Sequence, residues 1–180
     1  NLTQEWDKVF PKSDKVTHRK VSFRNRYGIM LAADLYMPRN VNEKLPAIAV
    51  SGPFGAVKEQ SAGLYAQTMA ERGFLTIAFD PSYTGESGGF PRYVASPDIN
   101  TEDFCAAVDY LSTRDDVDSE RIGIIGICGW GGMAVNAAAI DTRIKATVTS
   151  TMYDMSRVNA NGYFDAMDAD ARYELRKQLN

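Results

Sequence analysis

The stretch RIGIIGICGWGGMA, residues 121–134, decides the fold of this chain. Its run Ile122–Ile127 is short, rich in β-branched residues and free of charge, which is typical of a strand buried on both faces. The residues Met133–Ile140 favour a helix by intrinsic propensity. Between strand and helix lies one reactive side chain, Cys128, in a frame of four glycines. This pattern predicts a sharp strand-to-helix turn that lifts Cys128 above the edge of a sheet.

Such a turn resembles a nucleophile elbow, in which glycine stands two residues before and two residues after the nucleophile. Gly126 occupies the first position, whereas Trp130 stands at the second. We therefore expect either that the indole points outward or that the elbow is slightly shifted. The alternative interpretation is a buried, inert cysteine in a glycine-rich turn.

Composition limits the classes of protein. A length of 180 residues fits one domain with a sizeable core, and 44% hydrophobic and 24% charged residues are ordinary for a globular protein. A formal charge of −3 without a basic run argues against a nucleic-acid partner, and no apolar segment has the roughly 20 residues that span a membrane. Two cysteines provide no disulfide framework. We expect a cytoplasmic protein without cofactor or metal, and a removed secretion signal stays open because the sequence begins with Asn1.

Alternation of strand and helix patterns predicts an α/β fold. The segments Val16–Phe23 and Ile29–Tyr36 read as an outer hairpin around a turn at Asn25–Gly28. The further predicted strands are Pro46–Val50, Phe74–Phe79, Ile122–Ile127 and Arg143–Ser150, and the predicted helices are Glu59–Glu71, Thr101–Leu111, Met133–Ile140 and Asp168–Leu179. This order predicts a mainly parallel, doubly wound sheet with helices on both faces. We expect the apolar side of the first helix to contain Leu64, Tyr65, Met69 and Ala70. We also expect Thr101 as the N-cap of the second helix and a polar turn at Asp115–Glu120.

Three loops should meet where the parallel strands end: Ser51–Gly55, Asp80–Gly89 and Cys128–Gly132. At the start of a helix, the partial positive charge would favour the thiolate of Cys128, which is its nucleophilic form. An oxyanion hole would use the amide of Gly129 and that of Phe54, since Pro53 has no N–H. An ordinary Gly-Pro turn is the alternative interpretation of the second loop.

A catalytic base is missing from this pattern. The one histidine, His18, precedes Cys128 and falls on an outer strand, so we expect it on the surface. Asp154 follows the last strand and is a weak candidate for the catalytic acid. No residue completes a triad.

The stretches GPFGAVKE (residues 52–59), FDPSYTGES (79–87) and GICG (126–129) resemble the dienelactone-hydrolase-like branch of the α/β-hydrolases. Relatives in this branch are often grouped with serine aminopeptidases and Xaa-Pro dipeptidyl peptidases. The resemblance implies an α/β-hydrolase fold, a cysteine nucleophile at Cys128, and hydrolysis of small ester, thioester or lactone substrates through an acyl-cysteine intermediate. Family members continue past a cap with two strands that carry the acid and the histidine.

We therefore expect residues 1–152 to form the N-terminal part of a hydrolase core. Residues 153–180 would begin a cap or lid, or form a C-terminal helix that packs back on the core. The edge of the last strand, Ile144–Ser150, would be apolar and open, so a second copy, another chain or further residues should cover it.

Two other functions stay open. One is a non-catalytic binding or scaffold protein on the same fold. The other is a nucleotide-binding oxidoreductase, because Gly129–Ala134 fits the pattern G-x-G-x-x-A after a strand. Against the second, Val148–Ser150 ends the next strand without an acidic residue for a ribose.

Overall fold

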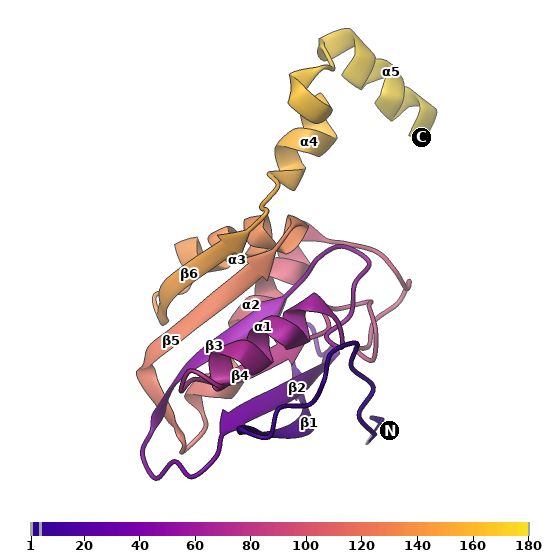
Figure 1. Ribbon diagram of the computed structural model, residues 1–180. Helices are drawn as coiled ribbons and strands as arrows, with labels where there is room; N and C mark the ends of the chain where they lie inside the picture. Colours follow the sequence, from indigo (N-terminus) through magenta and orange to yellow (C-terminus); the bar gives the residue numbers. More distant parts are fainter. Residues whose placement is uncertain (1, 4, 180) are drawn as a thin grey trace.

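The computed structural model, which describes residues 2, 3 and 5–179, contains a six-stranded sheet in the order β1-β2-β4-β3-β5-β6 (Figure 1). The strands are β1 (Val16–Arg24), β2 (Met30–Pro38), β3 (Leu45–Ser51), β4 (Leu75–Phe79), β5 (Val117–Ile127) and β6 (Ile144–Ser150). The helices are α1 (Ser61–Ala70), α2 (Pro97–Ser112), α3 (Gly129–Ile140), α4 (Met155–Asn161) and α5 (Ala169–Leu179), with a short 3₁₀ turn at Tyr163–Asp165. Strands β4, β3, β5 and β6 are parallel, and β2 is antiparallel to β1 and β4. The predicted mainly parallel sheet is thus confirmed.

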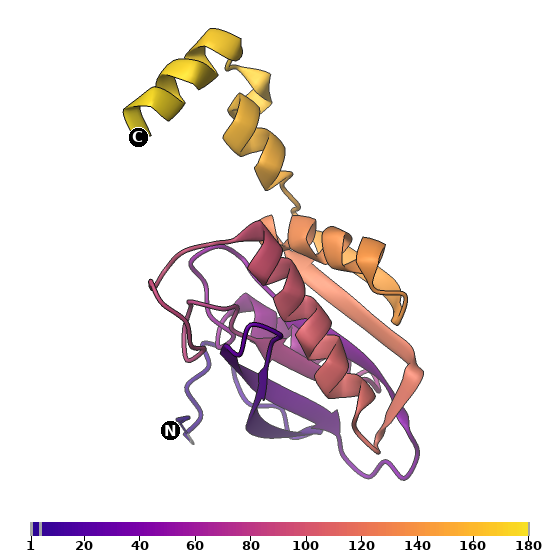
Figure 2. The same cartoon turned by 180° about the vertical axis from the view of Figure 1, so that it is seen from behind.

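Burial on both faces explains the central strands. All five residues of β4 are buried, as are most of those in β3, because helices cover both sides of the sheet. Helix α1 lies on one face, and α2 and α3 lie together on the other (Figures 1 and 2). The predicted outer hairpin is present, and its turn closes through the Gly28 amide, which donates to the Asn25 carbonyl at 2.9 Å.

The packing face of α1 differs in part from the prediction: Ala70 and Met69 pack toward the core as expected, but Leu64 and Tyr65 do not. Leu64 and Tyr65 are 46% and 39% exposed, and the buried stripe consists of Ala62, Ala66 and Ala70. Small residues at a spacing of four lie on one side of a helix and allow its backbone to approach the sheet closely. Close approach therefore outweighs side-chain size at this position.

The start of α2 also corrects the prediction. The helix begins at Pro97, whose fixed φ suits the first helical turn, so Thr101 lies inside the helix rather than at its cap. Asp103 is buried there and accepts hydrogen bonds from Asn25, Ser82 and Asn100. Burial raises the pKa of the Asp103 carboxyl.

The expected polar turn at residues 115–120 is wrong in part, because β5 already starts at Val117. Its register against β3 shifts between the Leu45–Val117 and Ala47–Ile122 pairs. This bulge accommodates the polar residues without ending the strand.

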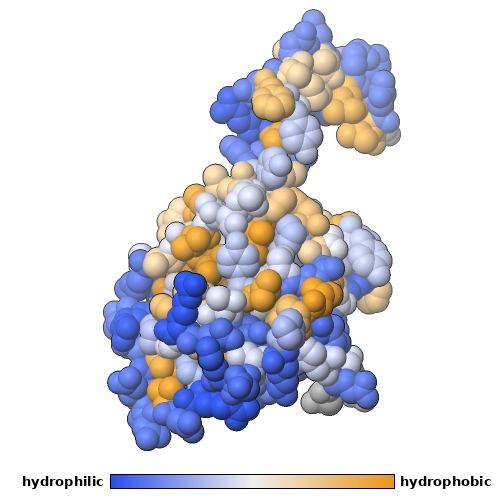
Figure 3. Space-filling model, in the orientation of Figure 1, coloured by the Kyte–Doolittle hydropathy of each residue, from blue (hydrophilic) through white to orange (hydrophobic). Residues whose placement is uncertain are grey.

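One edge and part of one face of the sheet are exposed. Strand β6 is the edge strand, and Val148 on it is 52% exposed. An apolar hollow of about 400 Å³ lies beside α1, over β3, β5 and β6, with Ile48, Phe74 and Ile125 among its lining residues. Figure 3 shows apolar side chains gathered on the upper part of the body, while the lower part is hydrophilic.

The segment after β6 leaves the body. Helices α4 and α5 project away from the sheet and do not pack back on it (Figures 1 and 2). Among the described residues, no helix is long and apolar enough to cross a membrane.

Candidate active site

The turn between β5 and α3 has the geometry of an elbow. Cys128 has φ 58° and ψ −126°, and α3 begins at the next residue, Gly129. Such a conformation costs a residue with a side chain on the order of 1–3 kcal/mol. The elbow is therefore centred on Cys128 and is not shifted.

Trp130 takes a position that the sequence did not predict. Its side chain is only 3% exposed and belongs to the main hydrophobic core, so the indole points inward. Its ring contacts that of Phe54 edge to face, with centroids 4.7 Å apart. A Cβ at Gly52, whose φ is +105°, would lie 2.9 Å from the Trp130 Cβ. The glycine before α1 thus provides the space that the motif usually obtains from a second glycine after the nucleophile.

Gly126 is required by close backbone contact. A Cβ at this position would lie 2.3 Å from the Trp130 carbonyl oxygen and 2.7 Å from the Ala134 Cβ. Helix α3 can therefore cross β5 at this distance only if residue 126 has no side chain.

We predict that Gly126→Ala lowers the free energy of unfolding by about 3 kcal/mol, because the new methyl group pushes α3 away from β5. Chemical denaturation measures the change. Gly88→Ala is the matched control, since a Cβ there meets nothing closer than 3.5 Å. Equal, small effects of the two substitutions would contradict this description of the elbow.

The loop after β3 lies directly on the elbow. A Cβ at Gly129 would be 1.9 Å from Cε2 of Phe54, so the Phe54 ring rests against the Gly129 backbone. Within the described residues, no acceptor receives the Phe54 amide, and the Gly129 amide belongs to the first helical turn, which has no intrahelical acceptor. The Phe54 and Gly129 amides are therefore both without a protein acceptor in the described part of the chain.

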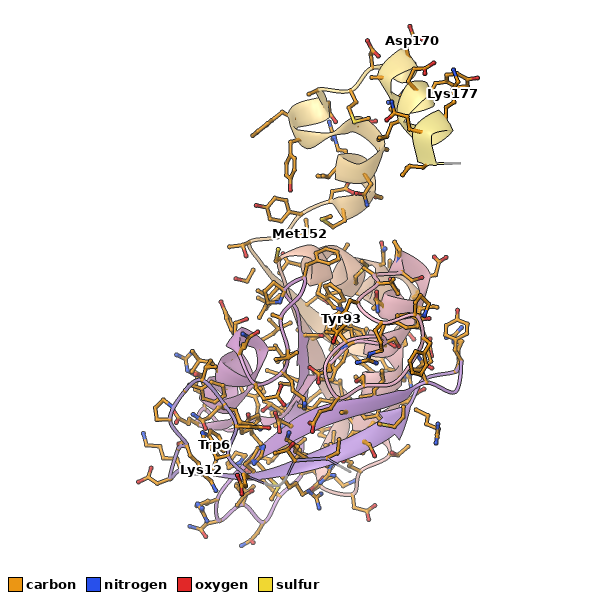
Figure 4. All side chains as sticks on the ribbon, turned by 90° about the vertical axis from the view of Figure 1, so that its right-hand side faces the viewer. Trp6, Lys12, Tyr93, Met152, Asp170 and Lys177 are labelled. Atoms are coloured by element: carbon orange, nitrogen blue, oxygen red, sulfur yellow. The ribbon has the colours of Figure 1, made fainter. Side chains whose placement is uncertain are left out.

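The segment after β6 closes the other side of the elbow. The Cys128 amide donates to the Ser150 carbonyl at 2.8 Å, and the Tyr153 amide approaches the Cys128 carbonyl at 3.4 Å. A Cβ at Gly131 would lie 2.8 Å from Cγ of Met152, which stands where the tail leaves the body (Figure 4). The elbow is thus fixed from both sides.

The candidate partners of a triad do not join Cys128. His18 lies on β1, four strand positions from β5, which corresponds to roughly 19 Å at about 4.8 Å per strand. Against expectation it is not a surface side chain: it contacts Trp6 and Tyr36, and its Nε2 lies 2.7 Å from Oδ1 of the buried Asp34.

Asp154 has a structural role in the described chain. Its carboxylate caps α4 and accepts hydrogen bonds from the Arg157 amide and the Ser156 hydroxyl at 2.9 and 2.7 Å. These bonds, with that of the Arg157 amide foremost, lower the pKa of the exposed Asp154 carboxyl.

The second cysteine is remote and inert by its surroundings. Cys105 is buried in α2, and both cysteines are free, as the sequence predicted. Burial, together with the charges of Asp141 and Glu102, raises the pKa of the Cys105 thiol to about 11. No cluster of side chains able to hold a metal ion occurs among the described residues.

A buried lysine–carboxylate cluster lies beneath the loops that follow β3 and β4, and the sequence did not predict it. It contains three lysines and five carboxylates: Lys8, Lys20 and Lys58, with Asp7, Asp34, Glu59, Asp80 and Glu86. Lys58 and Asp80 are at its centre, with side chains that are 0% exposed and 2.9 Å apart. Lys58 and Asp80 belong to the motifs at residues 52–59 and 79–87, but a lysine in a loop is normally exposed, so nothing in the sequence indicates that this one is buried.

Asp80 joins the loop after β3 to the loop after β4. Its carboxylate accepts from the Lys58 amide at 2.8 Å, from Lys58 Nζ and from the Glu86 amide, each at 2.9 Å. Burial disfavours the charge of Lys58, but Asp80 and the hydrogen bonds to Glu59 and Glu86 outweigh it, so the pKa of Lys58 is raised. Burial acts against the charge of Glu86 as well, yet the hydrogen bonds from Lys20 and Lys58 lower its pKa to about 2. Burial raises the pKa of the Asp80 carboxyl, and the charge and hydrogen bonds of Lys58 act against this shift. The contacts of Asp80 with Lys58 fix the segment that carries Phe54.

We predict that Lys58→Met lowers the free energy of unfolding by about 3–5 kcal/mol, because the Asp80 charge remains buried without its partner. Lys145→Met is the matched control: its bridge to Glu120 spans 3.7 Å between exposed side chains and should contribute less than about 1 kcal/mol. Urea denaturation of both variants measures the difference. Similar losses for the two variants would show that burial of the cluster has no energetic consequence.

Comparison with known proteins identifies the family. The family model for the X-Pro dipeptidyl-peptidase (S15 family) matches residues 27–176, and the chain belongs to this family. It is 70% identical to protein PA2218 of Pseudomonas aeruginosa over 179 residues, which are 99% of this chain and 48% of that protein. It is 31% identical over 137 residues to the thiohydrolase aneE of Aspergillus aculeatus, covering 76% of this chain and 42% of the relative. The chain therefore spans about half the length of these curated relatives.

Solved structures confirm the α/β-hydrolase fold. The crystal structure of PA2218 superposes with a TM-score of 0.97 at 69% identity, over 99% of this chain and 56% of that one. The α/β-hydrolase GrgF from a Penicillium species shares the fold, with a TM-score of 0.70 at 23% identity over 88% of this chain and 55% of its own. Dienelactone-hydrolase-like proteins share it as well. The resemblance to the dienelactone-hydrolase-like branch of the α/β-hydrolases, which the sequence motifs indicated, is thus confirmed for the fold.

Proposed function

We propose that the protein hydrolyses carboxylic esters or thioesters through a covalent acyl-cysteine intermediate at Cys128. The observation that carries this proposal is the conformation of Cys128, whose φ of 58° presents a thiol at the junction of β5 and α3. Strained backbone of this kind is retained where surrounding contacts enforce it, and it is concentrated at functional sites. The membership in a peptidase family and the name of the Aspergillus relative support hydrolysis as the class of reaction.

The reaction would proceed in two halves. The Cys128 thiolate attacks the substrate carbonyl carbon and forms a C–S bond, and the carbonyl electron pair moves to the oxygen, which accepts hydrogen bonds from the Gly129 and Phe54 amides. Collapse of this intermediate expels the alcohol or thiol, which takes up a proton. Water then attacks the acyl-cysteine, releases the carboxylic acid and restores the thiol.

A base is needed to move these protons, and we propose that it lies outside the 180 residues. His18 is unsuited because it lies on β1 and faces Asp34 of β2. Strands β2, β4 and β3 separate it from β5, the strand before Cys128. Cys128 directly precedes α3, and the partial positive charge of the helix start would stabilise negative charge that develops beside it in the first half of the reaction.

A nucleotide-binding oxidoreductase fits the site less well. The Phe54 ring fills the space beside Gly129, and Met152 fills the space beside Gly131, where a diphosphate would have to approach the backbone. A scaffold without catalysis requires only the fold and gives no reason for the strain at Cys128.

We predict that Cys128→Ala abolishes turnover of activated thioesters by the full-length protein, while Cys105→Ala, the matched control, retains it. In the unmodified protein, iodoacetamide at neutral pH should label Cys128 much faster than the buried Cys105, as read by peptide mass spectrometry. Retained turnover in Cys128→Ala would exclude the acyl-cysteine mechanism, and slow labelling of Cys128 would favour the scaffold.

A further inference from the structure

Two cavities flank the first turn of α3. One, of about 260 Å³, is lined by residues of the loop after β3, the loop after β4 and α3, among them Phe54, Val94 and Trp130. The other, of about 210 Å³, lies between α3 and the segment after β6, and its lining includes Asn136, Asp154 and Ser156. Both are smaller than the roughly 300–1,000 Å³ that hold an entire drug-sized ligand, so each suits one portion of a substrate.

The larger cavity has a distinct chemical character. Among the described residues no charged side chain lines it, and its wall combines one polar residue, Thr84, with aromatic and aliphatic side chains that include Phe54, Val94 and Trp130. Asp154, by contrast, places a carboxylate in the wall of the smaller cavity. The two cavities have similar proportions of apolar wall, so the larger one is distinguished by the absence of a carboxylate, which an apolar chain would have to desolvate.

The walls of this cavity are held in place. Arg92 donates to the carbonyls of Ser87 and Gly85 at 2.5 and 2.7 Å, and the Tyr93 amide donates to the Tyr83 carbonyl at 2.9 Å. On its floor, Gly85 packs so closely on Asp80 that a Cβ would lie 2.2 Å from the carboxylate. The cavity is thus preformed on the lysine–carboxylate cluster. Tyr93, one of its lining residues, lies in the upper part of the body, the part from which the tail leaves (Figure 4).

We infer that this cavity binds the apolar acyl chain of the substrate. The inference rests on the proposed function and identifies the substrate class: thioesters or esters of uncharged, medium-length aliphatic or aromatic acids. Phe54 links the two sites, since its ring lines the cavity and also rests on Gly129, the residue after the nucleophile. When an acyl group is bound to Cys128 with its oxygen at the Phe54 amide, its chain remains beside this ring after the leaving group has departed.

The test varies the acyl chain with a constant leaving group. In the full-length protein, the burst of nitrophenol from p-nitrophenyl acetate, butyrate, hexanoate and octanoate reports acylation of Cys128. Each methylene group that enters the cavity should raise the second-order rate constant of acylation by up to about fourfold. Val94→Asp, which places a charge in the cavity wall, should remove this rise.

Val135→Asp is the matched control. Both valines are partly exposed, at 38% and 45%, but Val135 lines only the smaller cavity, so its substitution should preserve the dependence on chain length. Thermal melting verifies that both variants fold, and Val94→Asn replaces Val94→Asp if the latter does not. Loss of chain-length dependence in Val135→Asp, with retention in the Val94 variant, would overturn the assignment of the cavity.

The outcomes also separate this inference from the proposed function. A chain-length series that is flat in the unsubstituted protein, combined with rapid iodoacetamide labelling of Cys128, would overturn the acyl site and leave the nucleophile in place. Absence of a burst together with an unreactive Cys128 would overturn both.

Discussion

The structure depends on the close approach of three backbone segments at the elbow. Cys128 adopts a positive φ, Gly126 leaves no side chain between β5 and α3, and Gly52 leaves none between the loop after β3 and Trp130. The contacts at Gly52 and Gly126 are too short for a Cβ, so the three segments can meet only with glycine at both positions. The consequence is that the thiol, the Gly129 amide and the Phe54 loop are placed by the body of the fold rather than by flexible side chains.

The buried lysine–carboxylate cluster fixes the loops after β3 and β4, which lie around the elbow. Desolvating Lys58 and Asp80 is costly, and their attraction offsets this cost only while both are present and hydrogen bonded. An apolar pair could fill the same volume, but it could not accept from the Lys58 and Glu86 amides as Asp80 does. The cluster therefore contributes orientation of two loops as much as stability, and these loops form both the edge of the elbow and the walls of the apolar cavity.

Much of the fold could be predicted from the sequence because its signals are local. The run Ile122–Ile127 is short, apolar and rich in β-branched residues, which favours a buried strand. The glycines around Cys128 favour a sharp turn directly after it. The inward position of Trp130 was not accessible in this way, since it depends on Phe54 and Gly52, which are far away in the sequence. The same holds for His18, which lies on an outer strand as predicted but packs against Trp6 and Asp34 instead of facing solvent. Lys58 was missed for a related reason: only tertiary contacts show that its charge is buried among carboxylates.

The central claim is that Cys128 is a nucleophile that forms a covalent acyl intermediate. Its most direct test is mass spectrometry of the full-length protein quenched in acid within the first turnover of a slowly deacylating thioester. The account predicts a mass increase equal to the acyl group, which peptide mapping assigns to the Cys128 sulfur. Turnover without any acylated Cys128, or acylation that maps to another residue, would contradict it.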